Sequence, residues 1–186
     1  AARSFSKPRR APRPSLARPT TAHAATQQTD VALRLEVHQN TRWFNGGDNA
    51  ISGSLPSTVG KLADLELLML RRNAMRGPLP TELGDLRAVQ TLDISQNNLT
   101  LELPTELGKL ATLTRLEASG NVLGALPTQL GKLSALTQLS VLTNALVELP
   151  TELGRLTALS AYLQVGWNAL SALPTELGEL TALRQL

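Results

Sequence analysis

The pair Leu-Pro recurs along most of the chain at a nearly constant interval, and this repeat limits the fold more than any other feature. The prolines of these pairs are separated by 23 or 24 residues, at positions 56, 80, 104, 127, 150 and 174. Repeats of this length are single supersecondary units that cannot bury an apolar face alone, and stacking them creates a continuous core. The sequence therefore predicts an elongated array of similar units.

Each unit contains an alternating pattern and a turn-forming pattern. Around Leu68 and Leu70 apolar residues alternate with period two, which predicts a short strand whose leucines point inward. The segment after each Leu-Pro pair, typically PTELGKL, has a proline suited to the first helical position and a glutamate suited to the start of a helix. Its glycine is interpreted as a left-handed exit from the turn. We expect one parallel strand and one short helical or 3₁₀ turn per unit, on opposite sides of the array.

The units read as LxxLxLxxNxLxxLPxxLGxL, and over residues 49–186 the chain resembles leucine-rich repeat proteins. This resemblance implies an α/β repeat fold, a solenoid with a parallel β-sheet on its concave face and short helical or 3₁₀ turns on its convex face. The first two junctions, NAISGSLP and NAMRGPLP, have the LxGxLP spacing of plant-type units of 24 residues. The junctions NVLGALP, NALVELP and NALSALP are one residue shorter and are similar to the 23-residue units of intracellular, Ras-group proteins. The chain is interpreted as a hybrid of the two types.

One asparagine per unit falls at the position that leucine-rich repeat proteins use for a structural ladder. A buried asparagine side chain there would bond to backbone groups of the turn that the sheet leaves unpaired. We therefore expect these residues to hold the fold together and to bind no partner. They are Asn73, Asn97, Asn121, Asn144 and Asn168.

Composition divides the chain into three regions. Residues 1–30 carry six basic side chains against Asp30 alone, with few residues that could anchor a core, which is typical of a disordered tail. This basic tail is interpreted as a solvated linker, an organelle transit peptide, or a nuclear or nucleic-acid-binding tract. Residues 31–48 are expected to form an atypical N-terminal cap, and residues 49–186 a solenoid that is truncated at its C-terminus.

Two aromatic residues stand out in the predicted cap. Trp43 and Phe44 either cover the apolar end of the stack or contact a ligand. The surrounding residues 41–48 form a poor strand pattern, whereas residues 33–37, with the sequence LRLEV, form a better one. Residues 41–48 are therefore interpreted as the poorer of the two candidate strands in the cap.

A second irregularity lies in residues 159–163. Three residues separate two leucines there, whereas the other units have two residues between the equivalent positions. The extra residue predicts a β-bulge, which re-aims the neighbouring side chains. It would present Tyr162 and Trp167 on or beside the exposed side of the strand, where aromatic residues are natural anchors for a partner.

Composition also excludes most catalytic chemistry. The chain has no Cys and only two His, which rules out thiolate nucleophiles, disulfides and Cys or His clusters around a metal. Asp93 and Glu117 lie at equivalent positions of adjacent units, but no nucleophile accompanies them. We expect no enzyme activity, no cofactor, no metal and no small-molecule substrate. The apolar stretches are also too short to span a membrane.

The positions that should face outward from the strands differ from unit to unit, whereas the inward leucines do not. Variation on one face of a constant scaffold is the arrangement that a recognition surface needs. Together with the resemblance, it predicts a protein-binding module of scaffold or signalling type that recognises a protein partner on its concave face. The candidate contacts are Met69, Arg71, Arg72, Asp93, Arg115, Glu117, Gln138, Tyr162, Gln164 and Trp167.

Two alternatives stay open, an ectodomain fragment of a leucine-rich repeat receptor and a structural array without a dedicated ligand. The sequon Asn98-Leu-Thr100 would allow N-glycosylation and supports the receptor. The absence of a recognisable signal peptide and of a Cys-pinned cap opposes it. We therefore expect an intracellular protein, with organelle targeting as an option, and nucleic acid only as a weak contact of the basic tail.

Overall fold

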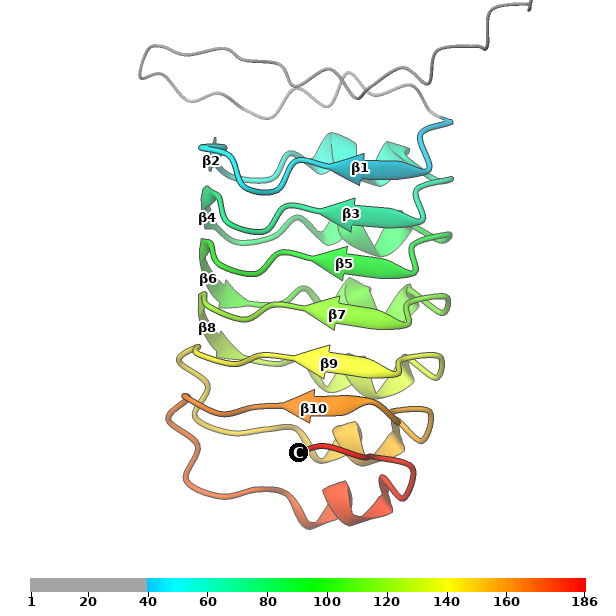
Figure 1. Ribbon diagram of the computed structural model, residues 1–186, viewed down its shortest axis with the longest axis vertical. Coiled ribbons are helices and arrows are strands. Elements are labelled where there is room, and N and C mark those ends of the chain that lie inside the picture. The colour runs from blue at the N-terminus through cyan, green and yellow to red at the C-terminus, as the bar shows by residue number, and fades with distance from the viewer. Residues whose placement is uncertain (1–39) are drawn as a thin grey trace, which may run out of the picture.

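The computed structural model describes residues 40–186, which form one stack with strands on one side and short helical turns on the other (Figure 1). The basic tail and residues 31–39 of the predicted cap lie outside the described residues. Six parallel strands form the larger sheet, in the order β1-β3-β5-β7-β9-β10. They are β1 (Trp43–Asn45), β3 (Leu67–Met69), β5 (Thr91–Asp93), β7 (Arg115–Glu117), β9 (Gln138–Ser140) and β10 (Tyr162–Gln164).

The middle residue of each strand points into the core, and its two neighbours point outward. The register places one leucine beside the next along the sheet, through Leu68, Leu92, Leu116, Leu139 and Leu163. All of these leucines are fully buried, as the period-two pattern predicts. Burial of one leucine side chain contributes about 1.5–3 kcal/mol, so the repeated core is the main source of stability.

Residues 41–48 contribute the first strand of the sheet, although their sequence forms a poor strand pattern. β1 pairs in parallel with β3, with Trp43 opposite Leu67. These residues, interpreted as a poor strand, form one because pairing with β3 outweighs the weak local preference for extended structure. Phe44 packs against the core as a cap residue should, but Trp43 is 72% exposed and does not cover the end of the stack. Residues 33–37 lie outside the described residues.

A short 3₁₀ helix follows each Leu-Pro pair, and these turns stack on the side opposite the larger sheet. A proline precedes each turn, and the leucine after it closes the turn with a backbone hydrogen bond, as from Leu110 N to the Leu107 carbonyl at 3.0 Å. Within residues 40–186, no helix is long and apolar enough to cross a lipid bilayer. The turns are η1 (Ser57–Lys61), η2 (Thr81–Asp85), η3 (Thr105–Lys109), η4 (Thr128–Lys132), η5 (Thr151–Arg155) and η6 (Thr175–Glu179).

The glycine inside each turn does not form the predicted left-handed exit. A side chain at Gly108 would place its Cβ 2.6 Å from the carbonyl oxygen of Gln129 in the next turn. Interiors are too closely packed to admit such a contact, so glycine is required where consecutive turns approach each other. The glycines of η1, η2, η4 and η5 are equally crowded, whereas Gly178 in η6 has nothing within 4 Å.

A second parallel sheet runs along one side of the stack, in the order β2-β4-β6-β8. Its first two strands end in left-handed glycines, with φ of +84° at Gly53 and +78° at Gly77. In the third strand Leu101 takes the same conformation, with φ of +68°, and its side chain is 64% exposed. A residue with a Cβ is strained in this region. The strands are β2 (Ser52–Gly53), β4 (Ala74–Gly77), β6 (Asn98–Glu102) and β8 (Val122–Ala125).

The extra residue in 159–163 is accommodated before β10 and not within it. β10 pairs with β9 in continuous register, with Tyr162 opposite Gln138. The chain bends at Ala161, whose N–H donates to the Thr137 carbonyl at 3.0 Å. The predicted bulge is therefore wrong. One more residue in a connection costs little entropy, whereas a bulge would leave ladder groups unpaired.

Candidate partner-binding surface

The first and third residues of each strand in the larger sheet face away from the core. Because the strands pair in register, these residues form two rows along the stack, with neighbours roughly 4.8 Å apart. The first row contains Trp43, Leu67, Thr91, Arg115, Gln138 and Tyr162, and the second contains Asn45, Met69, Asp93, Glu117, Ser140 and Gln164. We name these rows, with the residues that flank each strand, the strand face; it is the face predicted to be concave. The side formed by η1 to η6 is the turn face.

A row of residues in the left-handed conformation closes one edge of the strand face. Each lies directly before an asparagine of the ladder position, with φ of +51° at Arg72, +53° at Gln96 and +55° at Trp167. The other members are Asp48, Gly120 and Thr143. Non-glycine residues seldom adopt the left-handed conformation. Here it occurs in the loop that follows each strand of the larger sheet, where the chain turns.

The ladder asparagines hold this edge of the stack together. The Oδ1 of Asn121 accepts the N–H of Leu99 at 3.0 Å, and its Nδ2 donates to the carbonyls of Ile94 and Ala118, both at 3.1 Å. Asn121 is only 8% exposed. Because every polar atom of its amide is engaged with backbone groups, it has none left for a partner. Equivalent bonds are made by Asn73, Asn97, Asn144 and Asn168.

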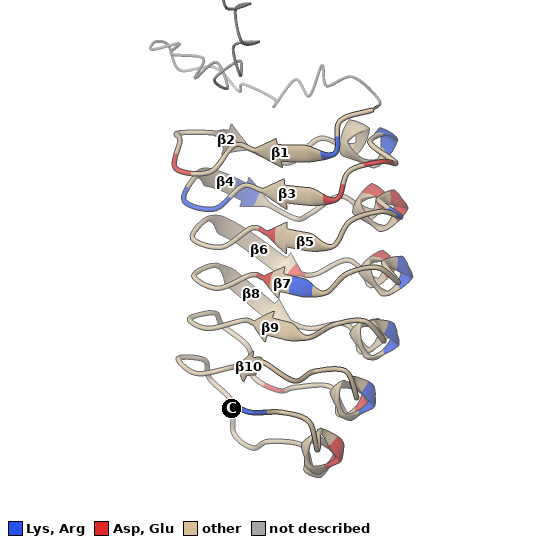
Figure 2. Ribbon diagram, turned by 45° about the vertical axis from the view of Figure 1, so that its right-hand side comes forward, with Lys and Arg blue, Asp and Glu red and all other residues tan. Residues whose placement is uncertain are grey.

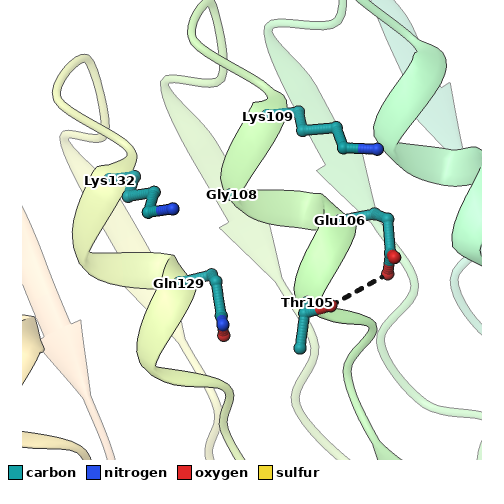
Figure 3. A pocket seen from close by; sticks show the side chains of 6 residues that line it. All are labelled: Thr105, Glu106, Gly108, Lys109, Gln129 and Lys132. Atoms are coloured by element: carbon teal, nitrogen blue, oxygen red, sulfur yellow. Dashed lines mark hydrogen bonds between the residues drawn. The ribbon is translucent and has the colours of Figure 1, made fainter.

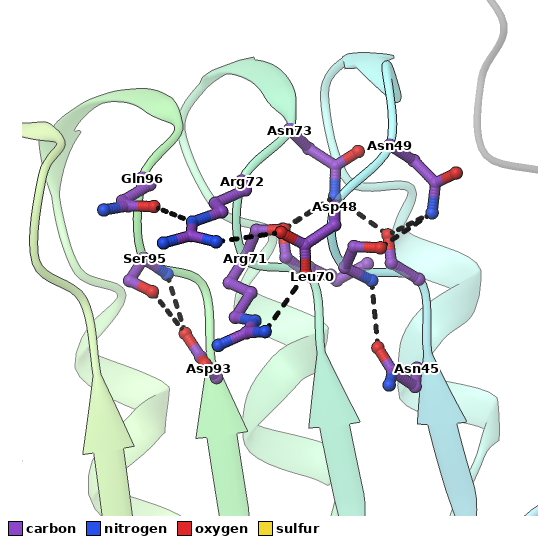
Figure 4. A network of polar contacts seen from close by, with 12 residues as sticks. Asn45, Asp48, Asn49, Leu70, Arg71, Arg72, Asn73, Asp93, Ser95 and Gln96 are labelled. Atoms are coloured by element: carbon purple, nitrogen blue, oxygen red, sulfur yellow. Dashed lines mark hydrogen bonds and ion pairs between the residues drawn. The ribbon is translucent and has the colours of Figure 1, made fainter.

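An ionic cluster occupies the N-terminal end of the strand face (Figure 4). Arg71 Nη2 lies 3.1 Å from one carboxylate oxygen of Asp48, and Arg72 Nη1 lies 3.2 Å from the other. Arg72 Nε also donates to the side-chain oxygen of Gln96 at 2.6 Å. The hydrogen bond from Arg72 is the main reason that the pKa of Asp48 is lowered from its ordinary value. Asp48 thus holds both arginines in place and neutralises part of their charge.

A second cluster joins β7, β9 and β10. The Tyr162 hydroxyl donates to the carboxylate of Glu117, and its oxygen lies 3.0 Å from the side-chain oxygen of Gln138. Arg115 Nε donates to the same carboxylate at 3.0 Å. Burial, followed by the hydrogen bond to Glu117, raises the pKa of Tyr162 to about 12. These four candidate residues, which sequence reasoning named separately, are brought into one hydrogen-bonded group.

The remaining candidates differ in how available they are to a partner. Met69 is half-buried on β3, and Gln164 accepts a hydrogen bond from Ser140 at 2.9 Å. Asp93 is 7% exposed, and its carboxylate accepts from the Ser95 hydroxyl at 2.6 Å. Trp167 is 84% exposed at the C-terminal end of the face. Asp93 is therefore the least accessible of the candidates, and Trp167 is the most accessible.

Three residues of this surface were not among the predicted contacts. Trp43 had two interpretations, and its exposure on β1 favours ligand contact over covering the end of the stack. Asp48 and Gln96 lie 24 residues before and after Arg72, at the same position of adjacent units. That spacing was the available signal, because residues at one position of neighbouring units stack side by side.

The turn face carries a shallow depression of about 200 Å³ between η3 and η4 (Figure 3). Sites for small molecules usually enclose about 300–1,000 Å³, so this depression is too small to be one. Charged residues of both signs lie along the turns (Figure 2). The depression is lined by Thr105, Glu106, Gly108, Lys109, Gln129 and Lys132.

Comparison with known proteins agrees with this architecture. A family model described as "Leucine-rich repeat region" matches residues 45–186. The chain is a leucine-rich repeat protein. No curated protein matches it significantly.

Solved structures similar to this leucine-rich repeat protein include plant receptors. The Arabidopsis receptor kinase HAESA, in complex with the peptide hormone IDA and the co-receptor SERK1, aligns with a TM-score of 0.72 and 29% identity over 79% of this chain and 25% of that chain. The plant peptide hormone receptor RGFR1, in complex with RGF2, aligns with a TM-score of 0.70 and 30% identity over 75% of this chain and 23% of that chain. This chain thus spans about a quarter of each receptor.

A smaller similar structure is the BIR3–SERK2 complex from Arabidopsis thaliana. It aligns with a TM-score of 0.61 and 29% identity over 70% of this chain and 69% of that chain. The leucine-rich repeat protein is therefore a solenoid module similar in structure to plant receptor ectodomains. Its parallel strands and 3₁₀ turns occupy opposite faces, as the sequence predicts.

Proposed function

We propose that this leucine-rich repeat module recognises a protein or peptide partner on its strand face. One observation carries the proposal: the outward rows change identity from strand to strand, whereas the core leucines, ladder asparagines and turn glycines stay constant. A face that varies on a fixed scaffold is suited to recognition. The complexes of RGFR1 with RGF2 and of BIR3 with SERK2 support binding as the role of such modules.

The two clusters of the strand face support the proposal energetically. Arg, Tyr and Trp are the residue types that most often dominate interface energy. Arg71, Arg115 and Tyr162 are already held by hydrogen bonds or ion pairs, so binding would freeze few of their rotamers. Such preorganisation favours tight binding on an open surface.

The test is a pull-down from source lysate with variants of the two faces. The double variant Arg71→Ala, Trp167→Ala should recover far less partner than the wild type. The matched variant of the turn face, Lys109→Glu, Lys132→Glu, should recover as much. Both variants must first show the thermal midpoint of the wild type. The opposite pattern, with recovery lost only in the turn-face variant, would contradict the proposal.

A second candidate function is the extracellular part of a receptor. Its support is the similarity to receptor kinase structures and the exposed Asn98, which begins β6 and has Thr100 two residues later. Location separates this candidate from an intracellular or organellar role. The full chain is expressed with a tag in source cells, and its mass is measured before and after glycosidase treatment. A mass that glycosidase lowers in the wild type but not in Asn98→Gln would support the receptor. A tag inside the cell, with no such mass, would support the intracellular role.

A further inference from the structure

From β1 to the loop after β10, the charged side chains of the strand face balance one another. Arg42 lies 3.3 Å from Glu66, the two arginines of the N-terminal cluster share Asp48, and Arg115 pairs with Glu117. The strands β9 and β10 carry no charged residue, and none is coloured there in Figure 2. Four arginines and four carboxylates lie between β1 and the loop after β10: Arg42, Arg71, Arg72 and Arg115, and Asp48, Glu66, Asp93 and Glu117. Beyond β10, the exposed Arg184 adds one positive charge at the C-terminal end.

Both tryptophans of the chain lie on this neutral face and project from it. Trp43 is 72% exposed at one end and Trp167 is 84% exposed at the other. Each has a half-buried leucine nearby, Leu67 opposite Trp43 on β3 and Leu142 against the backbone of the residue before Trp167. Tryptophan offers more apolar area than any other side chain and is usually well buried. Two such residues left in water on one face point to a partner that covers them.

Trp167 also holds an unfavourable backbone conformation. Its φ is +55°, a region that is uncommon for bulky residues. The same conformation recurs at this position of every unit, at Arg72, Gln96 and Thr143 for example, so the scaffold imposes it. Here the Asn144 N–H donates to the Trp167 carbonyl at 3.2 Å and helps to fix the loop that presents the indole.

The spacing of the two indoles sets the length of an occupant. The strand β1 and the loop after β10 are five strand intervals apart and offset along the strands, which gives a separation of roughly 25–30 Å. An extended segment that contacts both tryptophans needs about eight or nine residues, at about 3.3 Å per residue.

We infer that the strand face takes an extended, uncharged segment of a protein partner that is rich in apolar or aromatic residues and contacts both Trp43 and Trp167. This inference rests on the proposed function. A charged segment would have to compete with the internal ion pairs for their partners, whereas an uncharged one leaves them intact. Binding should therefore come from burial of apolar surface and depend little on salt.

The experiment uses the full chain and a display library of random 12-residue peptides. Selected peptides are synthesised with a fluorescent label and without tryptophan, and binding is measured by anisotropy. Because Trp43 and Trp167 are the only tryptophans of the sequence, the intrinsic emission of the protein reports on both. We expect uncharged peptides, a blue shift of the emission, and a Kd that changes less than about twofold between 50 and 500 mM NaCl.

Variants distinguish failure of this inference from failure of the proposed function on which it rests. Trp43→Ala and Trp167→Ala should each raise the Kd by about tenfold or more, and Lys109→Glu, Lys132→Glu should leave it unchanged. Charged peptides with a strong salt dependence, or a Kd unaffected by both tryptophan variants, overturn the inference. If the peptides that overturn the inference no longer bind to the Gln138→Arg variant, the strand face is still the binding surface, and only the inference fails. If no peptide binds, or only turn-face variants matter, the proposed function fails as well.

Discussion

On the turn face, the fourth residue of every turn from η1 to η6 is glycine, whereas the first outward residue of the strands is never the same twice. The strands hold two aromatic residues, a leucine, a threonine, an arginine and a glutamine at that position. The difference follows from what each position contacts. The turn glycines lie against the backbone of the next unit, and the outward residues of the strands project away from the core. Constancy in η1 to η5 therefore follows from contact between units, and the outward residues of the strands are free of that constraint.

The largest effect is expected at the turn glycines. Gly178 in the last turn is uncrowded and serves as the control. Gly108→Ala forces a Cβ against the Gln129 carbonyl and should lower the free energy of unfolding by about 3 kcal/mol, the upper range for overpacking. Gly178→Ala meets nothing and should be neutral or slightly stabilising, since alanine restricts the unfolded chain. Urea denaturation of both variants measures the difference. Equal losses would show that the crowding is not what selects glycine.

The ladder gives the next largest effect. Asn121→Ala leaves the Leu99 N–H and two carbonyls without partners in a buried site, and it should lower the free energy of unfolding by about 2 kcal/mol. Asn49 is exposed, and within the described residues its side chain bonds to two carbonyls of its own loop, so Asn49→Ala should cost well under half as much. Denaturation midpoints of the two variants check this ratio. A negligible loss at Asn121 would mean that water replaces its amide.

Much of this scaffold was readable from sequence because each unit repeats the same local pattern. Leu68 and its counterparts alternate as a buried strand requires, and the prolines mark the start of each turn. What sequence did not reveal depends on neighbouring units. The turn glycine is defined by the backbone of the next turn, β1 by pairing with β3, and the exposure of Trp43 by its place in that strand. None of these contacts is encoded within one unit.

A smaller effect on the free energy of unfolding is expected at Leu101 in the second sheet, where the preceding units have glycine. Leu101 occupies a left-handed position that is glycine at residues 53 and 77. Leu101→Gly should raise the free energy of unfolding by about 1 kcal/mol, because it removes backbone strain and exposes less apolar surface. Leu101→Ala keeps the strain and should change stability little. If alanine stabilises as much as glycine, the exposed side chain and not the backbone is the liability.

The smallest effect concerns the cluster of the strand face. Tyr162 is the only tyrosine of the sequence, so its absorbance change on ionisation should titrate with a pKa of about 12. A phenol whose pKa rises on folding contributes stability below its unfolded pKa of about 10, and this stability is lost as pH rises toward 12. Glu117→Gln should shift the titration downward, because it removes the negative charge beside the phenol. A titration that Glu117→Gln leaves unchanged would contradict the contact with Glu117 and would leave burial as the cause of the raised pKa.

The central claim, that the strand face and not the turn face meets the partner, is tested most directly by site-specific photo-crosslinking. Gln138 on β9 and Gln129 on η4 are both half-buried glutamines, on opposite faces, and each can be replaced by a photoreactive phenylalanine analogue. After irradiation in source lysate, the account predicts a discrete cross-linked partner from position 138 and none from position 129. A partner captured from position 129 alone would contradict it.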